Sequence, residues 1–197
     1  MDKVKSVSDV QSWVLLSSSI ALDEKWFSVR KDVVRLPSGK VVDDYFVWES
    51  PHIVQTIPVT SEGAFVLVRQ YRHAIAKIAY QFPAGAVDPG ETPEAAASRE
   101  LEEETGYRTN RLIRLGSGAP YSTKLTGYED FYLARDAAPT GQQHYDEQEE
   151  TNVVLMSQNE LLALLDSGKP QQMDLFAATF LALRYLEKHP TSDKVKS

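Results

Sequence analysis

The residues with the clearest capacity for chemistry are glutamates in a short acidic segment, residues 85–107, which reads GAVDPGETPEAAASRELEEETGY. Thr92 belongs to the residue types that cap helix N-termini, and Pro93 suits the first helical position. Gly106 is a typical helix terminator. The sequence therefore predicts a helix over 93–105 that carries the glutamates.

In such a helix three glutamates share one face. At about 100° per residue Glu100, Glu103 and Glu104 fall within an arc of roughly 100°, while Glu102 points to the far side. Neighbouring carboxylates disfavour each other's ionisation unless a cation lies among them. Oxygen ligands and the absence of cysteine favour Mg²⁺ or Mn²⁺ over zinc or copper. The alternative is a solvated helix face in which Arg99 and Glu103 form an ordinary surface ion pair.

The full spacing resembles the Nudix box at every fixed position. These positions hold, in order, Gly85, Glu91, Arg99, Glu100, Leu101, Glu103, Glu104 and Gly106. The closing position, normally aliphatic, holds Tyr107, a departure that concerns packing rather than catalysis. The resemblance implies an α+β fold, namely an α/β/α sandwich with a mixed sheet, preceded here by an N-terminal β-hairpin region.

The resemblance also implies roles for individual residues. It assigns the metal to the carbonyl of Ala84 and to the side chains of Glu100, Glu103 and Glu104. Arg99 and Glu103 are counted among the catalytic residues. Arg99 and Glu91 are expected to brace the loop against the helix, with Gly85 giving the backbone room to turn and Gly106 ending the helix.

The flanking residues resemble one branch of this family, the ADP-ribose pyrophosphatases and nucleotide-sugar hydrolases. A Q-Y-R triplet stands at 70–72 and a P-A-G tripeptide at 83–85. Arg72 is then a candidate for contact with a diphosphate, because a guanidinium can bind phosphate oxygens bidentately. Arg69 is the second candidate. The alternative for both is a solvated charge at a strand end.

One departure concerns the substrate. Members that act on ADP-ribose tend to carry a proline about fifteen residues past the box, where this chain has Ser122, with Pro120 two places earlier. ADP-glucose, GDP-mannose and other nucleotide sugars therefore remain open beside ADP-ribose.

The branch also suggests a general base and a base-stacking residue. A loop after the strand ending near residue 135 holds an acidic cluster. Within it, Glu147 aligns best with the glutamate that activates the attacking water in this branch. The alternatives are Glu149, Glu150 or a plain solvated loop. Trp26 is the better match for stacking on the nucleobase, and Trp48 is the weaker one. Core or dimer packing is the alternative for both tryptophans.

The predicted elements place these residues. Strands are expected near 28–36, 41–49, 52–60, 64–72, 111–117, 128–135 and 151–156, and helices at 92–105, 158–166 and 172–188. Pro37, Ser38 and Gly39 mark a hairpin turn between the first two strands. In the last helix an apolar stripe predicts core or interface packing; it consists of Met173, Phe176, Phe180 and Leu183.

Composition agrees with one enzyme domain over residues 1–197, and 190–197 are expected to form a flexible tail. The resemblance to the branch implies that about 1–50 are used in dimerisation. The net charge of −7 argues against a nucleic-acid partner, whose binding needs clustered Lys and Arg. The apolar run 14–22 is too short to span a membrane, so we expect a cytoplasmic protein without a membrane partner. The branch and base rates favour a homodimer.

We therefore expect Mg²⁺-dependent hydrolysis of a nucleoside diphosphate sugar to a nucleoside monophosphate and a sugar phosphate. The alternatives are a Nudix hydrolase of another class, acting on dinucleoside polyphosphates or modified nucleotides, and a non-catalytic nucleotide-sugar sensor. A purely structural role has nothing in the sequence to favour it.

Overall fold

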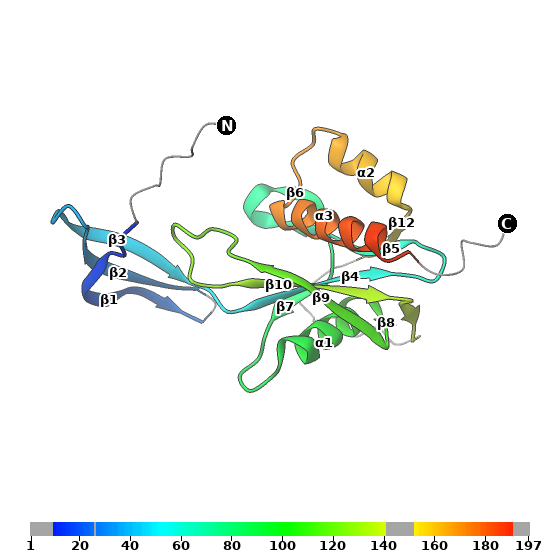
Figure 1. Cartoon of the computed structure of the whole chain (residues 1–197), viewed down its shortest axis with the longest axis horizontal. Helices are drawn as coiled ribbons and strands as arrows, with labels where there is room; N and C mark the ends of the chain where they lie inside the picture. Colours follow the sequence, from blue (N-terminus) through cyan, green and yellow to red (C-terminus); the bar gives the residue numbers. More distant parts are fainter. Residues whose placement is uncertain (1–9, 26, 141–151, 191–197) are drawn as a thin grey trace, which may run out of the picture. The chain divides into compact units, whose positions relative to one another are not determined.

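The computed structural model describes residues 10–25, 27–140 and 152–190 (Figure 1). The chain divides into two compact units, one formed by 1–50 with 121–127 and the other by 51–120 with 128–197. Within the described residues no helix is long and apolar enough to cross a membrane. The single domain expected over 1–197 stays a prediction.

The first unit is a three-stranded antiparallel sheet in the order β1-β2-β3. Its strands are β1 (Val14–Glu24), β2 (Phe27–Arg35) and β3 (Val41–Glu49). The predicted hairpin turn is confirmed, with Gly39 at φ 84° and its N–H donating to the Leu36 carbonyl. The first strand was not predicted, because three consecutive serines interrupt its apolar pattern. Every residue of β1 is exposed.

The second unit is built on a seven-stranded mixed sheet. Its central path is β12-β5-β4-β10-β9, in which β4 and β10 are parallel and the other neighbours are antiparallel. The strands of this sheet are β4 (Ile53–Val59), β5 (Phe65–Arg72), β6 (Lys77–Gln81), β7 (Ala84–Ala86), β9 (Arg111–Gly118), β10 (Glu129–Arg135) and β12 (Asn152–Met156). A short pair, β8 (Tyr107–Arg108) and β11 (Ala138–Pro139), lies outside it, and a 3₁₀ turn covers His73–Ile75.

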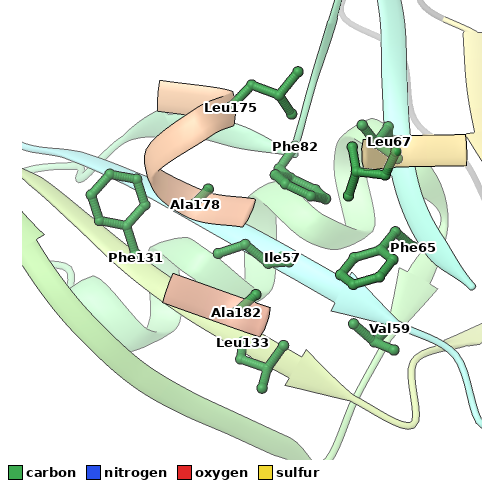
Figure 2. Packing of buried hydrophobic residues seen from close by; sticks show 11 residues of the cluster. Ile57, Val59, Phe65, Leu67, Phe82, Phe131, Leu133, Leu175, Ala178 and Ala182 are labelled. Atoms are coloured by element: carbon green, nitrogen blue, oxygen red, sulfur yellow. The ribbon is translucent and has the colours of Figure 1, made fainter. Parts of the chain in front are cut away.

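Three helices cover the two faces of this sheet (Figure 1). They are α1 (Pro93–Thr105), α2 (Gln158–Asp166) and α3 (Met173–Lys188), all within a residue or so of their predicted bounds. Val54 of β4 packs with α1, whereas Ile57 of the same strand packs with α3. Figure 2 shows the larger core on the α3 face, with Leu175 and Ala182 above the strands. Because side chains alternate between the two faces of a strand, β4 packs against α1 on one face and α3 on the other.

The sheet forks between β4 and β5. These strands pair only at Val59 and Phe65, and beyond that point each takes another partner. The first half of β4 pairs with β7, in the register Gln55 to Ala84, while the second half of β5 pairs with β6. Neither β6 nor β7 was predicted, because strands this short depend on their neighbours rather than on their own pattern. The fork brings the P-A-G tripeptide into the sheet.

The apolar stripe of α3 corrects one prediction. Met173 and Phe180 are 80% and 61% exposed, and Phe176 is also exposed. The residues that α3 buries are Leu175, Ala178, Thr179 and Ala182. Core packing was therefore wrong for most of the stripe, because the buried face of the helix lies one position away and is lined by smaller residues. The alternative of interface packing stays a prediction.

Candidate active site

The acidic helix begins and ends where its local sequence predicts. The Thr92 side chain accepts a hydrogen bond from the Ala95 N–H at 3.2 Å, and Pro93 occupies the first turn. At the other end Gly106 adopts φ 70°, and its N–H donates to the Glu102 carbonyl at 2.8 Å. These contacts satisfy groups that a helix leaves unpaired at its ends. The helix that carries the glutamates is thus fixed at both termini.

Arg99 is the centre of the hydrogen-bond network on this helix. Its Nε and Nη2 donate to the two carboxylate oxygens of Glu91 at 3.1 and 3.0 Å, a bidentate pair. Its Nη2 also donates to the Ala86 carbonyl at 3.0 Å. The hydrogen bonds that Arg99 donates to Glu91 raise the pKa of Arg99 and lower the pKa of Glu91. The loop before α1 is therefore tied to the helix through one guanidinium.

The same guanidinium lies between two of the predicted metal ligands. Nη1 of Arg99 donates to Glu100 Oε1 at 2.7 Å and to Glu103 Oε2 at 3.1 Å. Glu102 points elsewhere and forms an ion pair with Arg108, as the helical arc predicts. Two carboxylates of the predicted face thus already share a positive charge.

Strand β7 packs directly against this face. A Cβ atom added at Gly85 would overlap the carboxylate of Glu100, so the absence of a side chain is what admits Glu100 there. Next to it, the N–H of Ala84 donates to Glu104 Oε2 at 3.3 Å. Ala84 is therefore placed beside Glu104, and Gly85 beside Glu100.

These residues fit a hard divalent cation by their chemistry. The predicted ligands offer carboxylate oxygens and one carbonyl, the donors that Mg²⁺ prefers. Within residues 10–140 and 152–190, apart from residue 26, three His, Cys, Asp or Glu side chains do not converge on a single point. Arg99 holds Glu100 and Glu103 instead, so a metal would share these two acids with Arg99 or take them from it. Metal binding stays a prediction.

The two predicted arginines differ in their surroundings. Arg72, at the end of β5, is half-buried, and its Nη2 donates to the side-chain carbonyl of Gln81. Arg69 is exposed on the same strand. Arg72 therefore belongs to a buried polar network, and Arg69 does not.

Four predicted residues lie outside the described part of the chain. These are Trp26, Glu147, Glu149 and Glu150. Trp48, the weaker stacking candidate, lies on β3 of the first unit with its ring 5.2 Å from that of Phe27, and is 41% exposed.

Sequence reasoning missed a second acidic pair in the second unit. Glu129 of β10 is 7% exposed, and burial, reinforced by the charge of Asp174, raises its pKa to about 7. Burial also raises the pKa of Asp174 at the start of α3, against the opposing effect of Arg72. A signal was present in the apolar stretch YEDFYLA, where a glutamate opens an otherwise buried strand.

A cavity of about 730 Å³ lies at the opposite end of the same strands. Val59, Phe65 and Arg135 are among its lining residues, with Phe180 and Arg184 of α3. None of the predicted site residues lines it. The chemistry of the glutamates and this cavity are therefore separate features.

Comparison with known proteins gives two adjoining matches. The NUDIX domain matches residues 51–179, and the nucleoside diphosphate sugar hydrolase N-terminal domain matches residues 13–48. An ADP-ribose pyrophosphatase of Bacillus subtilis (strain 168) is 32% identical over 159 residues, which cover 78% of this chain and 81% of that protein. A methanol dehydrogenase activator of Bacillus methanolicus is 30% identical over 157 residues, covering 79% and 82%.

Solved structures show the same architecture. The crystal structure of an ADP compounds hydrolase has a TM-score of 0.82 at 22% identity, covering 93% of this chain and 99% of that one. At this identity the likeness concerns the fold alone, and it confirms the predicted α+β class.

Proposed function

The chain belongs to the Nudix hydrolase family. We propose that it hydrolyses the diphosphate of a nucleoside diphosphate sugar to a nucleoside monophosphate and a sugar phosphate. The observation that carries the proposal is the hydrogen-bonded set formed by Glu91 of the loop with Arg99, Glu100 and Glu103 of α1, beside Ala84 and Gly85 of β7. The match of the first unit to the N-terminal domain of nucleoside diphosphate sugar hydrolases supports this substrate class.

The proposed metal ligands are the Ala84 carbonyl, Glu100, Glu103 and Glu104. A bound Mg²⁺ supplies neutralisation of the diphosphate and a more acidic water. Arg99 would hold Glu100 and Glu103 in place through ion pairs, and Glu91 would hold Arg99 in place. Glu147 is proposed to take the proton from the attacking water, with Glu149 and Glu150 as alternatives.

The proposed substrate contacts lie at two places. Arg72 would bind the diphosphate through its guanidinium, with Arg69 as the second candidate. Trp26 would stack on the nucleobase. In the second unit Arg72 is half-buried with its Nη2 on Gln81, which holds the charge in a fixed position and supports its choice over the exposed Arg69.

We also propose a homodimer assembled through the first unit. Apolar side chains are exposed on and next to its first strand, namely Trp13 just before β1 at 50%, with Leu15 at 57% and Ile20 at 58% on β1. A small sheet that exposes so much apolar surface gains stability by covering it. The cytoplasmic location stays a prediction.

The deciding experiment measures hydrolysis of a substrate panel with Mg²⁺ and a coupled phosphatase, with and without EDTA. The panel holds ADP-ribose, ADP-glucose, GDP-mannose, UDP-glucose, diadenosine polyphosphates and nucleoside triphosphates. We expect turnover of a diphosphate sugar that EDTA abolishes. Glu104→Gln should lower kcat by about 100-fold or more, the scale for loss of one well-placed interaction with the transition state.

Glu102→Gln is the matched control, because Glu102 lies on the same helix but faces Arg108. It should retain nearly full activity. Turnover confined to triphosphates or dinucleoside polyphosphates would move the protein to another substrate class. Binding of a diphosphate sugar without turnover would favour a sensor.

A further inference from the structure

A connected group of polar side chains lies at the fork of the sheet, under the start of α3. Gln172 Nε2 donates to Gln81 Oε1 at 2.9 Å, and the same oxygen accepts from Arg72. The charge of Arg72 and the facing side-chain amide of Gln55 both lower the pKa of Asp174. The charge of Asp174 in turn raises the pKa of Glu129. The members come from β4, β5, β6, β10 and the N-terminal end of α3, and we call them the fork cluster.

The fork cluster has a buried floor and an accessible rim. Gln55, Gln81 and Glu129 are 0%, 3% and 7% exposed, whereas Arg72, Gln172 and Asp174 are half-buried. Leu175 and Phe82, which follow Asp174 and Gln81 in the chain, belong to the core shown in Figure 2. The cluster therefore adjoins the core on one side and is partly exposed to solvent on the other.

The floor carries hydrogen-bonding capacity that the described residues do not use. Neither Nε2 nor Oε1 of Gln55 makes a hydrogen bond of normal geometry, and Arg72 Nε and Gln171 Oε1 are likewise buried without a described partner. An unpaired buried amide costs free energy, so native proteins rarely keep one without a reason. Gln55 is wholly buried and faces Asp174. Its amide therefore keeps capacity for a better hydrogen bond, which a ligand that reaches Asp174 could supply.

The chemistry of the fork cluster selects a neutral ligand rich in hydroxyl groups. Each glutamine offers both donors and an acceptor, and a carboxyl beside them accepts further hydrogen bonds. A hydroxyl group can donate and accept at once, which matches this mixture. The cluster holds two acids and one arginine, so it has no excess of positive charge that would favour binding of a phosphate group at its buried residues. A metal ion is also disfavoured, because Arg72 already lies near Asp174.

We propose that the fork cluster binds the hydroxyl groups of the sugar attached to the diphosphate. This inference rests on the proposed function for the identity of the ligand, and it adds Gln55, Asp174 and Glu129 as residues that determine specificity. Gln55 pairs through its backbone with Ala84, the strand position beside Glu104. The side chain of Gln55 points to the α3 face, where Arg72, the proposed contact of the diphosphate, donates to Gln81 of the same cluster. A sugar seated on the fork cluster would therefore adjoin the diphosphate at Arg72, which suits a group joined directly to it.

The test is calorimetric binding of the two expected products, ribose 5-phosphate and AMP, with inorganic phosphate and free ribose as further ligands. Gln55→Leu should weaken ribose 5-phosphate binding by at least about tenfold, while AMP and phosphate binding stay within twofold. Asp174→Asn should act in the same direction. Because the Gln55 amide faces Asp174 without forming a hydrogen bond of normal geometry, Gln55→Leu should change the melting temperature by only a few degrees.

Thr179→Val is the matched control, since Thr179 Oγ1 is also buried without a described partner but belongs to no part of the fork cluster. It should leave ribose 5-phosphate binding intact. The proposal is overturned if Gln55→Leu and Asp174→Asn bind ribose 5-phosphate as the parent chain does, or if inorganic phosphate accounts for all the binding.

These outcomes separate the inference from the proposed hydrolysis. Turnover of a diphosphate sugar with kcat/KM unchanged in Gln55→Leu would overturn the fork cluster and leave the hydrolysis standing. Ribose 5-phosphate binding that Gln55→Leu abolishes, in a chain without turnover, would support the fork cluster and remove the hydrolysis.

Discussion

Arg99 joins three parts of the candidate site at the level of single residues. It contacts Glu91 in the loop, Glu100 and Glu103 on the helix, and the carbonyl of Ala86 on β7. A lysine has one compact ammonium group and could not meet these acceptors in their separate directions. The side chain is 29% exposed, so its ion pairs are partly screened by solvent. Its main effect is geometric rather than a large gain in stability.

Gly85 gives a prediction at this scale. Gly85→Ala would place a methyl group where the Glu100 carboxylate now lies, and the flexible glutamate would move rather than the backbone. We expect the free energy of unfolding to change by no more than about 1 kcal/mol. Displacing a proposed metal ligand by about 1 Å should lower kcat by about 100-fold. Urea denaturation and steady-state kinetics check the two halves.

Gly116→Ala serves as the control, because a Cβ there meets Leu181 only at 4.0 Å. It should retain both stability and activity. Full activity of Gly85→Ala would show that Glu100 does not need its present position.

Single residues also show what the sequence could predict. Glu91 and Arg99 were paired through a family resemblance, and their bidentate contact lies within one loop and its helix. Glu129 and Asp174 are 45 positions apart in the numbering and meet only because α3 crosses the start of β10. No local pattern encodes that meeting. Pairing of distant polar groups is therefore the part of the site that needed the structure.

Among the elements, the helices could be predicted best. Capping residues and turns of 3.6 residues are local signals, and α1, α2 and α3 all follow them. The strands β1, β6 and β7 were missed, as was the short pair β8 and β11. Each is held by backbone pairing with a neighbour rather than by its own apolar alternation. These strands therefore form because of their contacts in the folded protein rather than because of a local sequence pattern.

The cap of α1 carries a prediction for this scale. Thr92→Ala removes the acceptor of the Ala95 N–H and should lower the free energy of unfolding by about 1 kcal/mol. Chemical denaturation followed by circular dichroism measures it. Ser98→Ala is the control on the same helix, because the Ser98 hydroxyl only bonds back to the Glu94 carbonyl. That variant should be neutral or slightly stabilising. An equal loss in both variants would contradict the role of the cap.

At the scale of the whole molecule, the prediction of a Nudix enzyme is confirmed by the family match, and its assembly stays to be measured. We expect a dimer by light scattering coupled to size exclusion. Leu15→Lys with Ile20→Lys should yield a monomer, because both side chains are more than half exposed on β1 and charges there would oppose burial.

Leu155→Lys provides the comparison, since Leu155 is 53% exposed on β12 of the second unit. It should leave the dimer intact. A parent chain that is monomeric at micromolar concentration, or a dimer that survives both lysines on β1, would rule out this assembly.

The alternation of β4 bears on how such a protein changes over generations. Val54 and Thr56 contact α1, and the Thr56 hydroxyl donates to the Ala97 carbonyl at 2.9 Å. Gln55 lies between them and points to the opposite face of the sheet, toward α3. If Gln55 contacts the sugar as proposed, its substitution would alter the preferred ligand without changing the neighbours that pack against α1. Under that proposal, one strand would let evolution vary the substrate while the proposed catalytic helix is inherited unchanged.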